Sequence, residues 1–233
     1  MIYFNSRGAA ELTRYLLAAL EIPYDNMRYP LQASASGFGV TADFVEHQQA
    51  GHFAVNMGQL PVLQILTPDG KAAVATLGQS HAMNRFLAKE HGLLGATSLE
   101  GARIDAFYEA VRDVRSSYLQ SKKNGTKQKW LNEELPPLCE KLEGSLLPVP
   151  KPKDISTHPW LIGTTTSLAD ISLYSLLGTT TSLVSGSFIS AFDGFDPLSS
   201  YETTCPRLTA SVQAVAKLKG IQAWEERRPD TFS

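Results

Sequence analysis

Apolar positions near the start of the chain change from the spacing of a strand to that of a helix and back. Residues 2 to 5 form a short apolar run that predicts a strand. From Gly8 the apolar residues recur at helical spacing until Pro23 ends the pattern. They are Leu12, Leu16, Ala19 and Leu20. Residues 24 to 29 can form a second strand, so the order is strand, helix, strand.

A second group of elements follows after a segment that predicts little. Residues 32 to 55 are rich in Gly, Ser and Ala and show only weak periodicity. Val62 to Leu66 and residues 72 to 77 then read as two strands joined by a Pro-Asp-Gly turn at 68 to 70. A helix comes next, and its apolar residues are Ala82, Met83, Phe86 and Leu87. This order predicts a mixed sheet with helices packed on it.

The rest of the chain lacks strand signals and predicts an all-helical domain. Residues 1 to 88 are therefore assigned to an α/β domain of the form βαβ-ββα, and the Gly-containing polar segment 89 to 98 to a linker. Residues 99 to 233 form the all-α C-terminal domain. Its helical patterns lie at 99 to 119, 127 to 147, 167 to about 183, and 208 to 218.

Composition excludes several classes of function. The 233 residues are 43% hydrophobic and 19% charged, with a formal net charge of -2, so no basic surface is available for nucleic acid or an anionic membrane. Arg7 and Glu11 interrupt the start of the chain where a signal peptide would be apolar, and we expect a cytoplasmic location. Cys139 and Cys205 are far apart and predict free thiols. The histidines show no metal-binding pattern, so no metal is expected.

Four motifs in order support a resemblance to a known family. They are YFNSRGAAELTRYLLAALEIPYDNMR, then GQLPVL with LGQSHAMNRFLAKEHGLLG, then WLIGTTTSLADISL, and last WEERRPDT. Together they resemble a cytosolic glutathione transferase, most nearly the sigma class, which includes prostaglandin D synthases. The resemblance implies a thioredoxin-like N-terminal domain, glutathione as co-substrate, a small hydrophobic electrophile as second substrate, and a homodimer.

Tyr3 matches the catalytic tyrosine of this family. In that role a phenol O–H donates a hydrogen bond to the glutathione sulfur and favours the thiolate. A free thiol of pKa ~8.5 is only about 3% ionised at pH 7. A hydrogen bond to a charged acceptor is worth about 1.5 to 3 kcal/mol and would lower that pKa by ~1 to 2. The alternative is a tyrosine that only packs in the first strand.

The resemblance also implies how glutathione is held. Leu60 and Pro61 match a cis peptide that turns the Leu60 backbone toward the cysteinyl part of the ligand, and Gln59 matches a residue beside it. Gln79 and Ser80 match the pair that receives the γ-glutamyl carboxylate at a helix start. Ser80 can also simply cap that helix, and a proline at the first residue of an edge strand needs no function.

Helical residues of the second domain supply further candidates. Asp105 matches an acid that reaches the glutathione amine bound by the partner subunit, although a solvated helix acid would look the same. Tyr108, Arg112 and Ser116 recur at i, i+4 and i+8, so they can share one face and contact the second substrate. A surface packed against another helix would give the same pattern.

Two departures from the family affect these expectations. Sigma and alpha members usually carry an arginine beside the thiolate where this chain has Ala9, and Arg7 can replace it only if its side chain turns inward. Within residues 32 to 55 the family has a tryptophan and a lysine that contact the glycine carboxylate. The nearest candidates here are Phe44, His47 and Gln48.

The sequence therefore predicts a glutathione transferase in which Tyr3 stabilises the thiolate that attacks a small hydrophobic electrophile. A glutathione-dependent isomerase or peroxidase acting at the same site is the first alternative. A non-catalytic glutathione-binding protein on the same fold is the second, and Ala9 is the reason to consider it.

Overall fold

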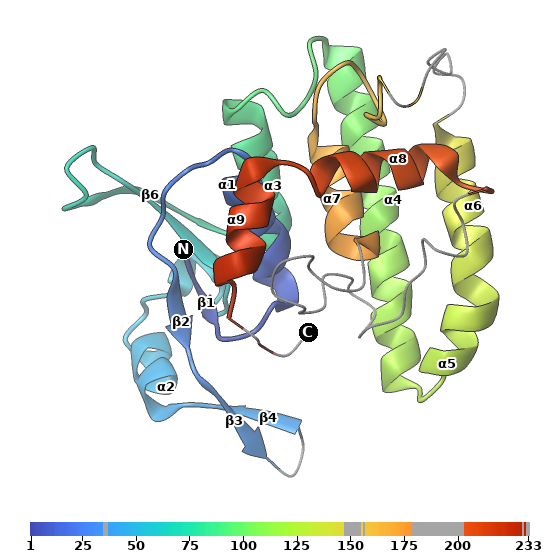
Figure 1. Cartoon of the computed structure of the whole chain (residues 1–233). Coiled ribbons are helices and arrows are strands. Elements are labelled where there is room, and N and C mark those ends of the chain that lie inside the picture. Colours follow the sequence, from blue (N-terminus) through green and yellow to red (C-terminus); the bar gives the residue numbers. More distant parts are fainter. Residues whose placement is uncertain (35–36, 147–154, 156, 179–202, 230, 232–233) are drawn as a thin grey trace.

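A four-stranded mixed sheet forms the centre of the N-terminal part of the chain (Figure 1). The computed structural model describes residues 1–34, 37–146, 155, 157–178, 203–229 and 231. The sheet has the order β2-β1-β5-β6, and its strands are β1 (Ile2–Phe4), β2 (Met27–Tyr29), β5 (Val62–Leu66) and β6 (Ala73–Gly78). β1 and β2 are parallel, whereas β5 runs antiparallel to β1 and β6. The predicted mixed sheet is confirmed.

Side chains alternate across this sheet and place its two faces in two different cores. Tyr3 and Leu63 belong to the main core, on the face covered by α1 (Glu11–Ala19) and α3 (Ser80–Glu90). Val62 belongs to a smaller cluster beneath α2 (Ala42–Gln49), together with Tyr29, Phe44 and Phe53. Because neighbouring residues of a strand point to opposite faces, the side chain of Tyr3 is directed toward the helical half of the molecule.

Residues 32 to 55, whose sequence shows only weak periodicity, contain regular elements. A two-stranded antiparallel hairpin, β3 (Leu31–Ser34) and β4 (Gly37–Val40), precedes α2, and a short 3-10 turn, η2 (Ala54–Asn56), follows it. The hairpin and α2 lie at the lower left of Figure 1. Phe38 and Val40 on β4 are exposed. Exposed apolar side chains such as these do not give the alternation of apolar and polar positions by which a half-buried strand is recognised.

All regular elements described in the C-terminal part are helices. Its elements are α4 (Ser98–Lys123), α5 (Lys127–Lys129), a π-helical turn η3 (Trp130–Glu134), α6 (Leu135–Ser145), α7 (Leu168–Leu177), α8 (Pro206–Val215) and α9 (Lys219–Arg227). α4 and α6 stand side by side, α7 packs against α4, and α8 crosses the upper part of this group in contact with α6 and α7 (Figure 1). The predicted α/β domain followed by an all-α region is confirmed.

Several helix limits differ from the prediction. α4 begins at Ser98, with the Thr97 hydroxyl accepting from the Glu100 N–H, and it continues to Lys123. The pattern expected to end near residue 183 ends as α7 at Leu177, and the residues from 179 to 202 lie outside those described. α9 was not predicted, because only Ile221 and Trp224 give its charged sequence an apolar face. Helix ends are the least readable feature of any sequence.

α9 returns the end of the chain to the N-terminal half. It packs on α1, and Gly220 makes this approach possible because a Cβ there would lie 1.8 Å from the Ala18 carbonyl oxygen. The Leu168 N–H also donates to the Leu93 carbonyl, 3.0 Å away, and so connects α7 to the segment after α3. The proposed linker at 89 to 98 stays a prediction. Over the described ranges, no helix has the length and apolar character needed to cross a membrane.

Candidate active site

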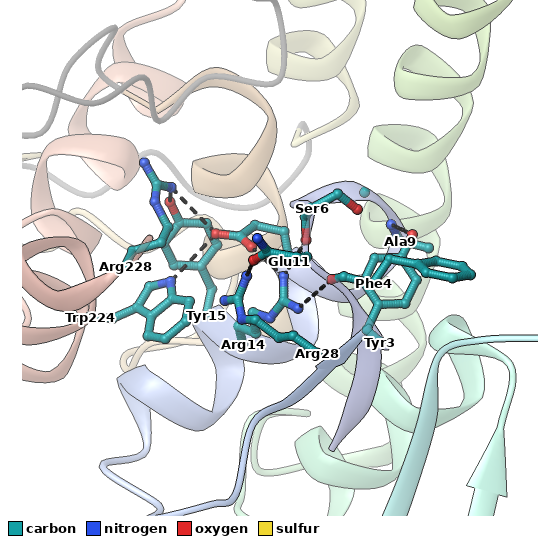
Figure 2. Close-up of polar contacts among 12 residues, drawn as sticks. Tyr3, Phe4, Ser6, Ala9, Glu11, Arg14, Tyr15, Arg28, Trp224 and Arg228 are labelled. Carbon is teal, nitrogen blue, oxygen red and sulfur yellow. Dashed lines mark hydrogen bonds and ion pairs between the residues drawn. The ribbon is translucent and has the colours of Figure 1, made fainter. Parts of the chain in front are cut away.

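The Tyr3 hydroxyl is held by the loop that follows β1. Its oxygen accepts a hydrogen bond from the Ala9 N–H, 3.0 Å away (Figure 2). Gly8 has φ +41°, and a Cβ there would lie 2.4 Å from the Tyr3 hydroxyl oxygen, so only glycine allows the loop to approach this closely. A hydroxyl that accepts one hydrogen bond still has its own proton to donate. The Tyr3 hydroxyl therefore keeps its own proton for a second hydrogen bond.

Two arginines fix this loop from different helices. Arg14 of α1 donates to the Ser6 carbonyl at 2.7 Å, and Arg115 of α4 donates to the Gly8 carbonyl at 3.0 Å. Burial lowers the pKa of Arg115, while the nearby Tyr3 acts in the opposite direction. A cation from α4 thus lies next to Ala9, where the family's usual arginine is missing. Arg7 is also buried and lines a cavity between α1 and α4, which is described below. Its side chain therefore turns inward, the condition under which it could replace the missing arginine.

The turn before β5 has the expected backbone. The Leu60–Pro61 peptide bond is cis, as the resemblance implied. Gln59 is exposed and Leu60 is half-buried, so this turn remains accessible to a ligand.

Asn56, which no sequence motif indicates, connects this turn to the start of α3. Its buried side-chain amide donates to the carbonyls of Gln59 (3.1 Å) and Pro61 (3.0 Å). Its oxygen accepts from the Gln79 N–H at 3.0 Å. One buried amide therefore sets the relative positions of both backbone segments expected to hold glutathione.

The start of α3 corrects one expectation. Gln79, not Ser80, occupies the N-cap position, with φ 63° and no side-chain capping bond, and the helix begins at Ser80. The physical reason is that the Gln79 N–H is already bonded to Asn56, which fixes the turn one residue earlier. Ser80 lines the cavity, so the positive end of the helix dipole faces it.

Replacing Asn56 with alanine is expected to weaken glutathione binding about 5- to 30-fold, since losing a buried hydrogen-bonding group costs ~1 to 2 kcal/mol. Calorimetry with glutathione measures the change. Gln64→Ala on the exposed face of β5 is the matched control and should bind like the wild type. Equal affinity of the Asn56 variant and the control would show that Asn56 does not organise the site.

A cavity of about 120 Å³ lies between α1, α3, α4 and α7. The three residues predicted from α4 to share one face, Tyr108, Arg112 and Ser116, all line it. Its apolar lining includes Leu12, Val111, Leu119 and Leu176. Gly8 and Ala9 also line it, whereas the Tyr3 side chain lies just behind them. The cavity therefore begins next to the Tyr3 hydroxyl.

The structure does not bring every candidate to this cavity. Asp105 forms an ion pair with Arg85, with its carboxylate 2.6 Å from the arginine Nε. Phe44 is a core residue stacked on Phe53, so its side chain is not placed to contact a ligand. The His47 ring nitrogen is hydrogen-bonded with the hydroxyl of Tyr29, 2.5 Å away.

The Gln48 side-chain amide is also engaged within the protein, because it donates to the Gly58 carbonyl at 2.7 Å. The expected contacts to the glycine carboxylate are therefore not supported by the geometry of residues 44 to 48. Across the described part of the chain, no group of three or more His, Cys, Asp or Glu residues is arranged to hold a metal ion.

Comparison with known proteins decides the family. The profile of the glutathione S-transferase C-terminal domain matches residues 112–228. Human hematopoietic prostaglandin D synthase is 30% identical over 236 residues, which cover 99% of this chain and 96% of the human protein. The chain belongs to the glutathione S-transferase family. Glutathione S-transferase S1 of Drosophila melanogaster is 31% identical over 242 residues, or 99% of this chain and 79% of that protein.

The fold of this glutathione S-transferase agrees with that assignment. The structure of the sigma class GST of Fasciola hepatica matches it with a TM-score of 0.67, covering 99% of this chain and 96% of that one at 18% identity. The resemblance inferred from the four sequence motifs is confirmed, and so is the combination of a mixed-sheet domain with a helical one.

Proposed function

We propose that this glutathione S-transferase conjugates the glutathione thiolate to small hydrophobic electrophiles, with Tyr3 as the catalytic residue. One observation carries the proposal: the Tyr3 hydroxyl accepts from the Ala9 N–H and so keeps its own proton for the sulfur. Because the sulfur is then stabilised as an anion, attack needs no separate general base.

The proposed glutathione site lies between the cis turn and the start of α3. Leu60 and Pro61 would align the cysteinyl backbone, with Gln59 beside it. Gln79 and Ser80 would receive the γ-glutamyl carboxylate at the positive end of α3. The electrophile would occupy the cavity lined by Tyr108, Arg112 and Ser116.

Titration of the bound thiol tests the proposal directly. We expect calorimetry to show glutathione binding, and ultraviolet thiolate absorbance of the complex to give a pKa ~1 to 2 below the free value of about 8.5. Turnover should then appear on a panel of aryl halides, isothiocyanates and unsaturated carbonyls. Binding without a lowered thiol pKa, and without turnover on the panel, would favour the non-catalytic alternative.

A glutathione-dependent isomerase is the second candidate function. The human relative at 30% identity over 99% of the chain is named a prostaglandin D synthase, which favours this reading. Product analysis with a lipid endoperoxide and with a hydroperoxide separates isomerase, peroxidase and transferase activity. An isomerised product with glutathione recovered unchanged would identify the isomerase.

We further propose that the protein is a cytoplasmic homodimer. Cys139 and Cys205 are both buried and free, which suits a reducing compartment. Asp105 is only partly buried in its ion pair with Arg85, and its position on α4 is consistent with the proposed reach toward glutathione in the partner subunit. Sedimentation equilibrium measures the assembly, and a mass of one chain would refute the dimer.

A further inference from the structure

A chain of hydrogen bonds runs from the interior of the protein to His81 at the cavity. Thr13 of α1 donates to the Asn84 side-chain oxygen at 2.7 Å, and the Asn84 amide donates to the Tyr108 hydroxyl at 3.0 Å. The Tyr108 hydroxyl is 2.5 Å from His81 Nδ1. Thr13, Asn84 and Tyr108 are buried, and His81 is half-buried. His81, Asn84 and Tyr108 all line the cavity.

These bonds favour the imidazole tautomer that carries its proton on Nε2. Since the Asn84 oxygen accepts from Thr13, its amide nitrogen faces Tyr108 and acts only as a donor. The Tyr108 hydroxyl accepts that bond and can donate its own proton to His81 Nδ1. A neutral imidazole that accepts at Nδ1 carries its proton at Nε2.

The surroundings of His81 keep the ring neutral. Burial lowers the pKa of His81 to about 4, and the cations Arg112, Arg85 and Arg115 act in the same direction. The ring therefore presents an oriented N–H at neutral pH and is not a source of acid. A fixed neutral donor in a small cavity is suited to an oxygen that gains negative charge during a reaction.

We propose that His81 Nε2–H donates to the carbonyl oxygen of the second substrate and favours α,β-unsaturated carbonyl compounds. The inference rests on the proposed transferase function. The thiolate sulfur bonds to the β-carbon, and the electrons of the carbon–carbon double bond shift to leave negative charge on the carbonyl oxygen. The enolate then takes a proton from water at the α-carbon. Glutathione has added across the double bond, and nothing leaves.

Electrophiles that react without an oxyanion provide the comparison. When glutathione displaces chloride from benzyl chloride, a carbon–sulfur bond forms, chloride leaves, and no substrate oxygen gains charge. His81 has nothing to stabilise in that reaction. The ratio of kcat/KM for a medium-chain unsaturated aldehyde to that for benzyl chloride therefore reports the hydrogen bond itself.

His81→Leu is expected to lower this ratio at least about tenfold. His81→Gln keeps an N–H donor and should restore much of it. Tyr108→Phe should also lower the ratio, because the ring loses the partner that holds its proton on Nε2. His91→Leu, the same substitution at the exposed end of α3, is the matched control and should leave the ratio unchanged.

The outcomes separate this inference from the proposed function. A wild-type protein that conjugates neither compound overturns both. If the wild type is active and His81→Leu has the same ratio as the wild type, the role of His81 alone is overturned. If His81→Leu does not fold, the ratio of Tyr108→Phe decides in the same way. A reduced ratio in these variants with rescue by His81→Gln supports it.

Discussion

The Tyr3→Phe variant is expected to lose about 10- to 150-fold in kcat/KM, because a hydrogen bond to a charged sulfur is worth ~1.5 to 3 kcal/mol. Phenylalanine keeps the ring, which packs edge-on against Phe4 and lies 5.6 Å from the Arg14 guanidinium carbon. Only the hydroxyl is removed. The pKa of bound glutathione, read from thiolate absorbance, should rise toward its free value in the same variant.

Tyr24→Phe is the matched control for that experiment. The Tyr24 hydroxyl is buried and forms no hydrogen bond within the described residues, and its ring lies near Trp224 on the far side of α1. Its removal should leave kcat/KM and the thiol pKa unchanged. If Tyr3→Phe behaves like this control, the first tyrosine only packs in the strand and the catalytic assignment fails.

How much the sequence predicted depends on which contacts are local in the chain. The strands around Tyr3 and residues 62 to 66 were readable because each buries side chains on both faces of the sheet and therefore contains consecutive apolar residues. The hairpin of β3 and β4 was not, since its apolar residues Phe38 and Val40 are exposed and do not mark a buried face. α9 was missed because its place depends on Gly220 touching α1, about 200 residues earlier in the chain.

The candidate site shows the same division. Tyr3, the cis turn at Pro61 and the α4 face were predicted because short motifs carry them. Asn56 and Arg115 were not, because their roles come from contacts to Gln79 and Gly8 that no local spacing records. Ala9 alone indicated a missing charge, and the sequence had no means of showing that another helix brings an arginine to the same loop.

A buried cluster of charges joins α1 to the C-terminal segment behind the site. The Glu11 carboxylate lies 3.2 Å from an Arg14 Nη and 3.3 Å from an Arg228 Nη, and it also accepts from the Trp224 indole N–H (Figure 2). Arg14 in turn donates to the Ser6 carbonyl in the loop that holds Tyr3. The cluster therefore connects the C-terminal segment, through α1, to the loop that positions Tyr3.

Glu11→Gln is therefore expected to lower the free energy of unfolding by ~3 to 5 kcal/mol, because it removes the buried negative charge that faces the guanidinium groups of Arg14 and Arg228. Glutamine keeps the shape of the side chain, so the decrease in the free energy of unfolding measures the contribution of the carboxylate charge. Urea unfolding at neutral pH measures it. Glu46→Gln on the exposed face of α2 is the control and should change the free energy by less than about 0.5 kcal/mol.

The pH dependence of the same variant distinguishes charge from packing. Burial alone would raise the pKa of Glu11, but Arg14, Arg7 and Arg228 outweigh it and the net pKa is lowered. The stabilisation is therefore fully present above the unfolded-state pKa of about 4.3 and is lost as the pH falls from there through the folded-state pKa. Urea unfolding in a series of acid buffers should show the difference between wild type and Glu11→Gln shrinking across that window. A difference that stayed constant into acid would mean that glutamine disturbs packing and that the carboxylate charge contributes little.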